Sequence, residues 1–292
     1  WNIAPPNLVR PIITWQAHFG KVNSLAFMTS TQTTSSTPAT ILVTVGCIGA
    51  QINVEALPDG TNPCSQGDIV TWDVSDPRQP KPIGGLLKAS DTLFAEEFSY
   101  GSDYYFRASS LATDIHLLAV DDNYKNITLV DLTNPQSPIF AGNYTADTLN
   151  EFETGNVGSL VISQNGQLLA TMNSYGNLNV LSISTNPEVP QVGYAIEALP
   201  FLPLLETAET LLALNANGSA LFTSNPKSGM QVWNVDQTIS WTNQNWQTYT
   251  VGYGYSVAFH PSQPLIATNH AGNGIRLWDI SNPNAPHLIS HF

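Results

Sequence analysis

A phrase near the C-terminal end of the chain, Gly274–Pro286, occurs almost unchanged at Asp68–Pro80. In both places an apolar stretch ends in a Trp-Asp pair and is followed by a turn that contains two prolines. Weaker copies lie at Ile127–Pro138 and Leu178–Pro190, and Gly229–Asp236 keeps the apolar stretch without the prolines. Copies of one phrase that are separated by tens of residues are typical of an array of small structural modules.

The five copies recur at regular intervals. When Trp72, Val130, Leu181, Trp233 and Trp278 are taken as equivalent, the spacings are 58, 51, 52 and 45 residues. Each spacing has room for four short stretches in which apolar and polar residues alternate, which is the pattern of half-buried β-strands. No long stretch has the period of a helix. The sequence therefore predicts an all-β fold, a β-propeller of four-stranded blades.

We expect a single propeller domain over residues 1–292, with five blades. The repeats are predicted at about 17–87, 104–144, 155–196, 207–246 and 254–292. Two further segments, Leu8–Gln16 and His287–Phe292, qualify as an outer strand of the blade that contains Trp278. We expect residues 8–16 to close the ring in that place, because propellers hide their strand edges, and the C-terminal segment to be a spare edge. The alternative is a fragment of a larger propeller that is completed elsewhere in the native polypeptide.

Charge and hydropathy exclude two classes of protein. The chain has a net charge of −13 and only 9 Lys and Arg residues, whereas nucleic-acid binding depends on clustered cations. No apolar run approaches the roughly 20 residues of a membrane-spanning helix. The chain begins with Trp1 instead of Met, which indicates a processed product or an excised domain. Because few residues are charged, Asn, Gln, Ser and Thr must cover the surface. We therefore expect an extracellular or cell-surface protein, the alternative being a cytoplasmic domain of a larger protein.

The only two cysteines, Cys47 and Cys64, flank one polar insertion. We expect a local disulfide across this insertion, the alternative being two unrelated thiols. Asn126, Asn143 and Asn217 each begin a triplet of the N-glycosylation type. A chain this rich in Asn and Thr contains such triplets by chance, so they do not establish glycosylation.

No pattern in the chain indicates catalysis, a metal site or a cofactor. The Gly-x-Ser-x-Gly, phosphate-loop and dinucleotide motifs are all missing from the sequence. The adjacent carboxylates Glu96-Glu97 and Asp121-Asp122 would point to opposite faces of a strand, so neither pair is a ready acid–base dyad. We therefore expect a protein without enzymatic activity and without a cofactor.

The histidines and the remaining tryptophans have ordinary interpretations. His287 and His291 would share one side of a terminal strand, but we interpret both as surface residues because no further metal ligand accompanies them. Trp241 and Trp246 lie in a segment rich in Asn and Gln, which would suit sugar stacking if the rings are exposed. Packing on the rim of a blade is the more common role for such tryptophans.

The first and last repeats resemble the WD-repeat family. The residues that carry the resemblance are Ala17-His18, Leu42-Val-Thr44 and Thr71-Trp72-Asp73 in the first repeat, and Ser256-Val-Ala-Phe-His-Pro-Ser, Ile266-Ala-Thr268 and Leu277-Trp278-Asp279 in the last. In that family a hydrogen-bond chain links a His before the first strand, a Ser or Thr in the second, a Trp in the third and an Asp in the turn between the second and third. The resemblance implies structural roles for His18, Thr44, Trp72, Trp233, Thr268 and Trp278.

The chain departs from the family pattern in places. The insertion between Cys47 and Gly67 displaces the expected turn Asp of the first repeat, and the last repeat lacks the His. Asp121-Asp122 falls at the expected turn of the second repeat. The proline turns resemble those of bacterial surface and signalling propellers. Together these resemblances imply a propeller that acts as a binding platform instead of an enzyme.

Two classes of function follow. The first is a non-catalytic interaction or scaffold module for a protein or other extracellular partner, and the alternative is a carbohydrate-active propeller, either a lectin or a glycoside hydrolase. In a propeller, the loops between the second and third strands and those that lead to the next blade share one face. Tyrosine is enriched at interfaces, so this loop-rich face is the predicted docking surface, although loops also gather aromatic residues simply to pack themselves. Its predicted residues are His18, Phe94, Glu96, Glu97, Tyr104, Tyr105, Asp121, Asp122, Tyr124, Tyr175, Tyr253, Tyr255 and His270.

Overall fold

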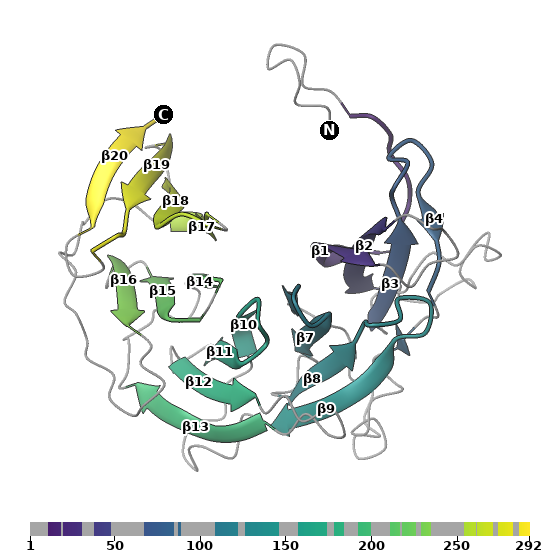
Figure 1. The fold of residues 1–292 in the computed structure, drawn as a ribbon, viewed down its shortest axis with the longest axis horizontal. Helices are drawn as coiled ribbons and strands as arrows, with labels where there is room; N and C mark the ends of the chain where they lie inside the picture. The colour runs from purple at the N-terminus through teal and green to yellow at the C-terminus, as the bar shows by residue number, and fades with distance from the viewer. Residues whose placement is uncertain are drawn as a thin grey trace. The chain divides into compact units, whose positions relative to one another are not determined.

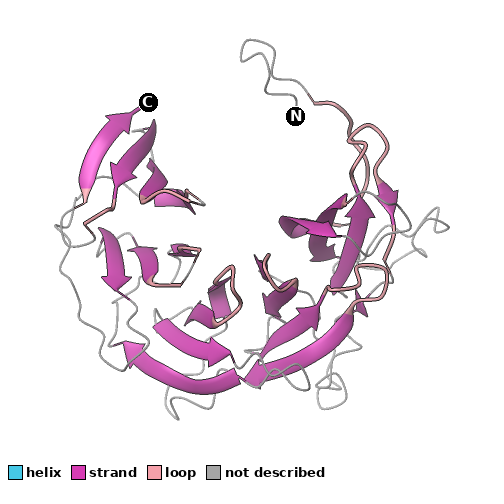
Figure 2. Ribbon diagram, viewed as in Figure 1, coloured by secondary structure: helices cyan, strands magenta, loops and turns pink. Residues whose placement is uncertain are grey.

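Within the part of the chain that the structure, a computed structural model, describes, every regular element is a β-strand (Figure 2). The described residues are 11–18, 20–30, 38–47, 67–84, 87–88, 109–121, 126–145, 157–173, 178–183, 192–199, 211–216, 218–225, 229–234, 254–260, 262–270, 274–282 and 286–292. Among them there is no helix with the length and apolar character needed to cross a membrane.

The described strands form five sheets, each built from strands that follow one another in the chain (Figure 1). The first sheet has the order β1 (Val22–Ser30), β2 (Ala39–Cys47), β3 (Gly67–Asp73) and β4 (Lys81–Pro82), and β5 (Leu87–Lys88) also pairs with β3. The second has the order β6 (Ser109–Ala112), β7 (Leu117–Asp121), β8 (Asn126–Asp131) and β9 (Ile139–Thr145).

The remaining three sheets follow the same scheme. The third has the order β10 (Val157–Ile162), β11 (Leu168–Asn173), β12 (Leu178–Ile183) and β13 (Val192–Leu199). The fourth has the order β14 (Leu211–Leu214), β15 (Ala220–Asn225) and β16 (Gly229–Asn234). The fifth has the order β17 (Gly254–Phe259), β18 (Leu265–His270), β19 (Gly274–Asp279) and β20 (His287–His291).

The chain divides into two compact units. One consists of Trp1–Ser109, His116–Asn123 and Thr128–Ala141, and the other consists of Ser110–Ile115, Tyr124–Ile127 and Gly142–Phe292. The first sheet lies wholly in the first unit, and the third, fourth and fifth sheets lie wholly in the second.

One cross-strand register recurs in the first, third, fourth and fifth sheets. In each, a residue of the third strand pairs with the residue that lies two positions before a buried Thr of the second strand. The pairs are Trp72 with Leu42, Leu181 with Leu169, Trp233 with Leu221, and Trp278 with Ile266. The threonines are Thr44, Thr171, Thr223 and Thr268, with exposed fractions between 1% and 3%. The equivalence of positions 72, 181, 233 and 278 that the spacing predicts is therefore confirmed.

The second strands are covered on both faces. In β2, Ile41, Val43 and Val45 are fully buried on one face, while Leu42 and Thr44 are buried on the other. This is the arrangement that the continuous β-branched run at Ile41–Val45 predicts. An apolar strand of this kind has no polar face to turn toward water, so it must lie between two layers.

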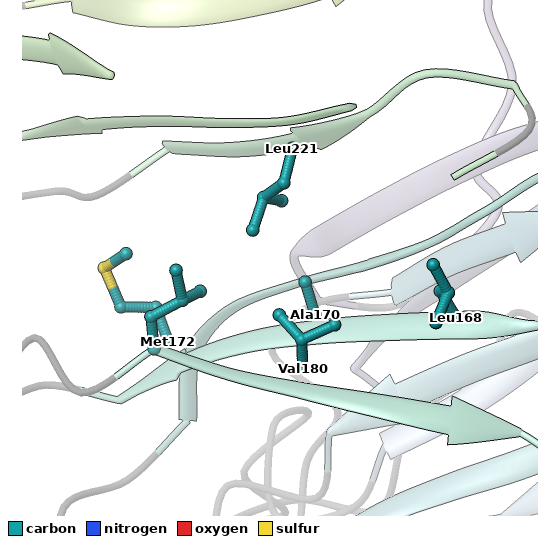
Figure 3. Packing of buried hydrophobic residues seen from close by; sticks show 6 residues of the cluster. Leu168, Ala170, Met172, Val180 and Leu221 are labelled. Atoms are coloured by element: carbon teal, nitrogen blue, oxygen red, sulfur yellow. The ribbon is translucent and has the colours of Figure 1, made fainter. Parts of the chain in front are cut away.

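Apolar packing between successive sheets is clearest in the second unit. Leu221 of β15 lies over Ala170 and Met172 of β11 and Val180 of β12, and Leu168 extends the cluster along the strand (Figure 3). All are at most 3% exposed. Burial of a side chain such as Leu or Met stabilises the folded state by about 1.5–3 kcal/mol. This cluster packs the third sheet against the fourth.

The first unit adds a polar contact between neighbouring sheets. The hydroxyl of Thr71 in β3 donates to the backbone carbonyl of Pro135, which lies in the proline turn after β8 (2.6 Å). The backbone N–H of Ile83 donates to the carbonyl of Thr71 (3.0 Å). Gly84 lies directly against this contact, because a Cβ atom there would meet both the Thr71 hydroxyl and the Pro135 carbonyl oxygen.

The predicted closing strand is wrong. The fourth place in the sheet that contains Trp278 is held by β20, which pairs with β19. Residues 11–17, the described part of the predicted strand and its continuation, form no strand, and residues 8–10 lie outside the described residues. The C-terminal segment follows β19 closely in the sequence, so its pairing with β19 has a smaller entropic cost of loop closure than pairing with the distant N-terminal segment.

The prediction that His287 and His291 share one side of a strand is also wrong. His287 pairs with Asp279 and His291 pairs with Arg276, and the register shifts between these pairs. Asp279 and Arg276 lie an odd number of residues apart, so they face opposite sides of β19. A β-bulge in β20 adds one residue and thereby moves the two histidines to different faces.

Substitution of Gly84 tests the contact between the first and second sheets. Gly84→Ala should lower the free energy of unfolding by about 1–3 kcal/mol, because the added methyl group displaces the Thr71 hydroxyl from the Pro135 carbonyl. Thr71→Val, which removes the same hydrogen bond without adding bulk at Gly84, is the matched comparison. In urea denaturation the double variant should lose less than the sum of the single losses. Strict additivity would mean that Gly84 and Thr71 do not act at one contact.

Candidate functional site

The first sheet contains a buried chain of three polar side chains. The indole N–H of Trp72 donates to the hydroxyl oxygen of Thr44 (3.0 Å), and Nε2 of His18 lies 3.0 Å from the same oxygen. The Thr44 hydroxyl also lies 3.3 Å from the carbonyl oxygen of Val70. Because an indole can only donate, the Thr44 oxygen must accept from Trp72 and use its own proton on His18 or Val70. The hydrogen-bond chain that the family resemblance implies for these three side chains is therefore present.

The fifth sheet repeats the central bond of this chain. The indole N–H of Trp278 donates to the hydroxyl of Thr268 (3.0 Å), and both side chains are buried. Trp278 packs with Ile266, Ile280 and Phe222 in one apolar cluster. In the first sheet the ring of Trp72 is instead met edge-on by Trp15, with centroids 6.0 Å apart. The hydrogen bond from the indole to the Thr hydroxyl, which we call the Thr–Trp clamp, is thus common to both sheets. The apolar side chains around it differ between the two sheets.

One end of the first, third and fifth sheets carries a repeated irregularity, and we call the corresponding end of every sheet the bulged end. It is the end where the second strand passes to the third and where the first strand begins. The register shifts there between Val22 and Ser24, between Val157 and Ser159, and between Gly254 and Ser256. The extra residues are Asn23, Gly158 and Tyr255. Bulges often re-aim side chains beside binding and catalytic sites, so this end is the candidate functional site.

Two buried carboxylates belong to the bulged end. Asp68 is the second residue of β3 and is 1% exposed, and Asp121 ends β7 and is fully buried. Each makes an interaction within the protein. Asp121 is among the predicted docking residues and Asp68 is not, although an acidic residue near the start of an otherwise apolar strand is a visible signal in the sequence. Because both side chains are buried, neither carboxylate is available to contact a partner.

Few of the predicted docking residues can be placed. His18 is 3% exposed and serves the Thr44 network, so it offers almost no surface for contact. Tyr255 lies in β17 at the bulge, and His270 ends β18 beside it, since Gly254 pairs with His270. The residues outside the described part are Phe94, Glu96, Glu97, Tyr104, Tyr105, Asp122, Tyr124, Tyr175 and Tyr253. Cys64 also lies outside it, so the disulfide with Cys47 stays a prediction.

The opposite end of each sheet, which we call the hairpin end, is where the chain leaves the third strand, and in the first, second and fifth sheets the sequence there is a proline turn. Its acidic side chains cap backbone N–H groups: Asp73 accepts from Ser75 (2.9 Å), Asp131 from Thr133 (2.7 Å) and Asp279 from Ser281 (2.8 Å). A second cap follows three residues later, where Asp76 accepts from Arg78 and Asn134 from Gln136. The acidic and amide residues of these turns therefore hold the chain in its turn conformation.

These caps change the acidity of the carboxyl groups. The pKa of Asp73 is lowered chiefly by the backbone N–H of Ser75, with its hydroxyl and Lys81 acting in the same direction and burial opposing them. The pKa of Asp279 is lowered chiefly by the Ser281 hydroxyl, which donates to the carboxylate at 2.6 Å. A lowered folded-state pKa stabilises the fold above the ordinary value of 3.8, and this stabilisation is lost as the pH falls below it.

Comparison with known proteins now identifies the fold. Residues 247–279 match the WD domain, G-beta repeat, and residues 118–146 match the LVIVD repeat. The chain is a WD-repeat-like β-propeller. The first match includes Trp278-Asp279, and the second includes Ile127–Asp131 with its proline turn. Comparison with curated proteins finds no significant match.

Solved structures agree with this fold. The β-propeller domain of Cps50 (Swd1) from Myceliophteria thermophila is 15% identical, with a TM-score of 0.53, over 86% of this chain and 68% of that one. A protein from Lactobacillus plantarum is 14% identical, with a TM-score of 0.50, over 91% of this chain and 94% of that one. At these identities the likeness concerns the fold alone.

The Thr–Trp clamp can be tested by removing the hydroxyl. Thr44→Val should cost about 2–4 kcal/mol of unfolding free energy, because it leaves the Trp72 indole and further partners unpaired, and Thr268→Val about 1–3 kcal/mol. The exposed Thr40 of the same strand provides the control, since Thr40→Val should change stability by less than about 0.5 kcal/mol. The measurement is urea denaturation. Equal, small losses in all three variants would contradict a structural role for the clamp.

Titration of Asp279 tests the turn caps. Ser281→Ala removes the main cause of its lowered pKa, so the carboxyl should titrate closer to 3.8 in NMR spectra of the side-chain carbon. Asp73, whose partner is Ser75, should titrate unchanged in the same sample. In Ser281→Ala, the free energy of unfolding should fall less as the pH drops below 3.8, because the pKa values of Asp279 in the folded and unfolded states then differ less. An unchanged Asp279 titration would show that Ser281 is not its partner in solution.

Proposed function

We propose that the chain is a non-catalytic interaction module that binds a protein partner at the bulged ends of its sheets. The observation that carries this proposal is the repeated bulge at Asn23, Gly158 and Tyr255. All three lie at the end where the second strand connects to the third. The connections at that end include the longest between paired strands of the first sheet, residues 48–66, and the loops with the predicted tyrosines.

The way polar side chains are used at the hairpin end supports the bulged end as the binding site. At the hairpin end, acidic and amide side chains are used to cap the backbone of short turns. If one of these side chains bound a partner instead, the turn that it caps would lose a hydrogen bond. The clamp at Thr44 and Thr268 fixes the second and third strands, so the connections between them leave from rigid positions. A rigid frame with variable connections at one end is suited to recognition.

The partner should be polar or cationic. The predicted docking residues include Glu96, Glu97 and Asp122, and the whole chain has a net charge of −13. Association with a cationic partner would weaken as salt screens these charges. WD-repeat propellers commonly bind proteins, which favours a protein partner over the carbohydrate alternative. We place this interaction at the cell surface or outside the cell, in keeping with the polar, charge-poor composition.

Site-specific photocrosslinking tests which end binds. A crosslinking amino acid would replace Val22 at the bulged end or Gln79 at the hairpin end, because both residues lie in the first unit and both are exposed. In an extract of the source organism, the Val22 probe should give a discrete protein adduct that is lost at high salt, and the Gln79 probe should not. An adduct from Gln79 alone would mean that the wrong end has been chosen.

Tyrosine substitution then refines the docking surface. Once the adduct partner is purified, Tyr104→Ala, Tyr124→Ala and Tyr253→Ala should each weaken its binding by about tenfold or more if these rings are anchors. A glycan array and a panel of chromogenic glycosides, applied to the same preparation, test the carbohydrate alternative. Glycan binding or glycoside cleavage without any protein adduct would replace the proposed function.

A further inference from the structure

Three hairpin turns of the second unit share one construction. Each joins the first strand of a sheet to the second, and its first residue donates a backbone hydrogen bond across the turn. The bonds run from Ser163 to Leu168 (2.9 Å), from Asn215 to Ala220 (3.0 Å) and from His260 to Leu265 (2.9 Å). The turns are therefore closed by the same backbone ring, and they differ in the side chain of the first residue.

That side chain also accepts a backbone N–H in all three turns. The hydroxyl of Ser163 accepts from Leu168 (3.0 Å), and the amide oxygen of Asn215 accepts from Ala220 (2.9 Å). In the third turn, Nδ1 of His260 accepts from the backbone N–H groups of Ser262 (3.2 Å) and Gln263 (3.0 Å). Histidine thus occupies a capping position that a hydroxyl and an amide occupy in the other two sheets.

The histidine cap differs from the others in one chemical respect. An imidazole nitrogen accepts a hydrogen bond only while it carries a lone pair, so the turn requires the neutral ring with its proton on Nε2. Protonation places an N–H at Nδ1, where it faces two backbone N–H donors. Both hydrogen bonds are then lost. The Ser163 hydroxyl and the Asn215 amide do not become protonated when an imidazole does, so their hydrogen bonds persist. We propose that His260 makes this turn a proton-sensitive element of the fold.

The surroundings of the turn connect it to the core of the fifth sheet. The backbone N–H of Ile280 donates to the carbonyl of Pro264 (2.8 Å), which ties the turn to the end of β19. Ile280 and Ile266 belong to the cluster around Trp278. Opening of the turn would therefore loosen the edge of this cluster, so the effect reaches beyond an exposed loop.

The other titratable groups near this turn can be named. Asp279 pairs with Leu265 at the same end of the sheet, and its carboxylate is engaged by Ser281. His287 of β20 pairs with Asp279. Arg276 and His291 pair with each other, and Arg276 pairs with Thr268 in the middle of β18. β14, which contacts β17 from the fourth sheet, contains only Leu and Ala. Asp279 and His287 are thus the ionisable neighbours whose effects an experiment must separate from that of His260.

NMR spectroscopy can make this separation. In the intact chain, the amide protons of Ser262 and Gln263 should shift upfield as the pH falls, with the same midpoint as the ring resonances of His260. Amide protons of Leu168 and Ala220, which are held by the Ser163 and Asn215 caps, should show no such step. His260→Asn, which installs the cap of the fourth sheet, should abolish the step at Ser262 and Gln263, although Asp279 and His287 are unchanged in this variant.

Two results would overturn the proposal. The first is a step at Ser262 and Gln263 that persists in His260→Asn, because it would then originate from Asp279 or His287. The second is a nitrogen spectrum in which the neutral ring of His260 carries its proton on Nδ1, since such a ring cannot accept there. This second measurement uses the unmodified chain, so it decides the question even if His260→Asn fails to fold.

Discussion

The hydrogen bond from a third-strand indole to a second-strand Thr is the interaction on which the blade architecture depends. It joins Trp72 to Thr44 and Trp278 to Thr268, in the interior of the first and fifth sheets. A one-residue slip of a strand would turn every side chain to the opposite face, and it would leave the indole N–H without an acceptor. Because both side chains of each bond are buried, water could not replace the Thr hydroxyl as the acceptor of the indole N–H. The bond therefore fixes the register that the flanking turns and connections require.

The third sheet shows what remains when the indole is missing. Leu181 occupies the Trp position opposite Leu169, while Thr171 is retained. Asn179 pairs with Thr171 and is 5% exposed, and its side-chain carbonyl oxygen has no hydrogen-bond partner in the described part of the chain. Such an oxygen costs about 1–3 kcal/mol. Apolar packing of this sheet against Leu221 offsets that cost, so register there is held by shape and burial instead of a polar clamp.

The sequence was informative where a feature is local and periodic. The equivalence of Trp72, Trp233 and Trp278 follows from spacing, because strand alternation ties each position to one face, and the roles of Thr44 and Thr268 follow from the family resemblance. The bulge in β20 has no residue signature, and it separated His287 from His291 despite their spacing. The closing strand failed for another reason. Leu8–Gln16 and the C-terminal segment have similar apolar patterns, and a pattern does not state which neighbour a strand will pair with.

The candidate site was predictable only in part. Connections between the second and third strands share one end of their sheets, so the loop-rich end follows from strand order alone. Which side chains are available there depends on tertiary contacts, and His18 and Asp121 are buried in the folded chain. The capping roles of Asp73, Asp279 and His260 depend on turn geometry at single atoms, which spacing does not specify.

Hydrogen exchange of the tryptophan indole N–H groups tests the clamp most directly. Protein labelled with nitrogen-15 in its tryptophans would be transferred to deuterated water, and the signals of Trp72 and Trp278 assigned through Trp72→Phe and Trp278→Phe. Both indoles should exchange much more slowly than that of Trp15, a residue that is 37% exposed. Exchange of Trp72 or Trp278 as fast as that of Trp15 would contradict a buried bond to Thr44 or Thr268, and with it the account of how these sheets keep their register.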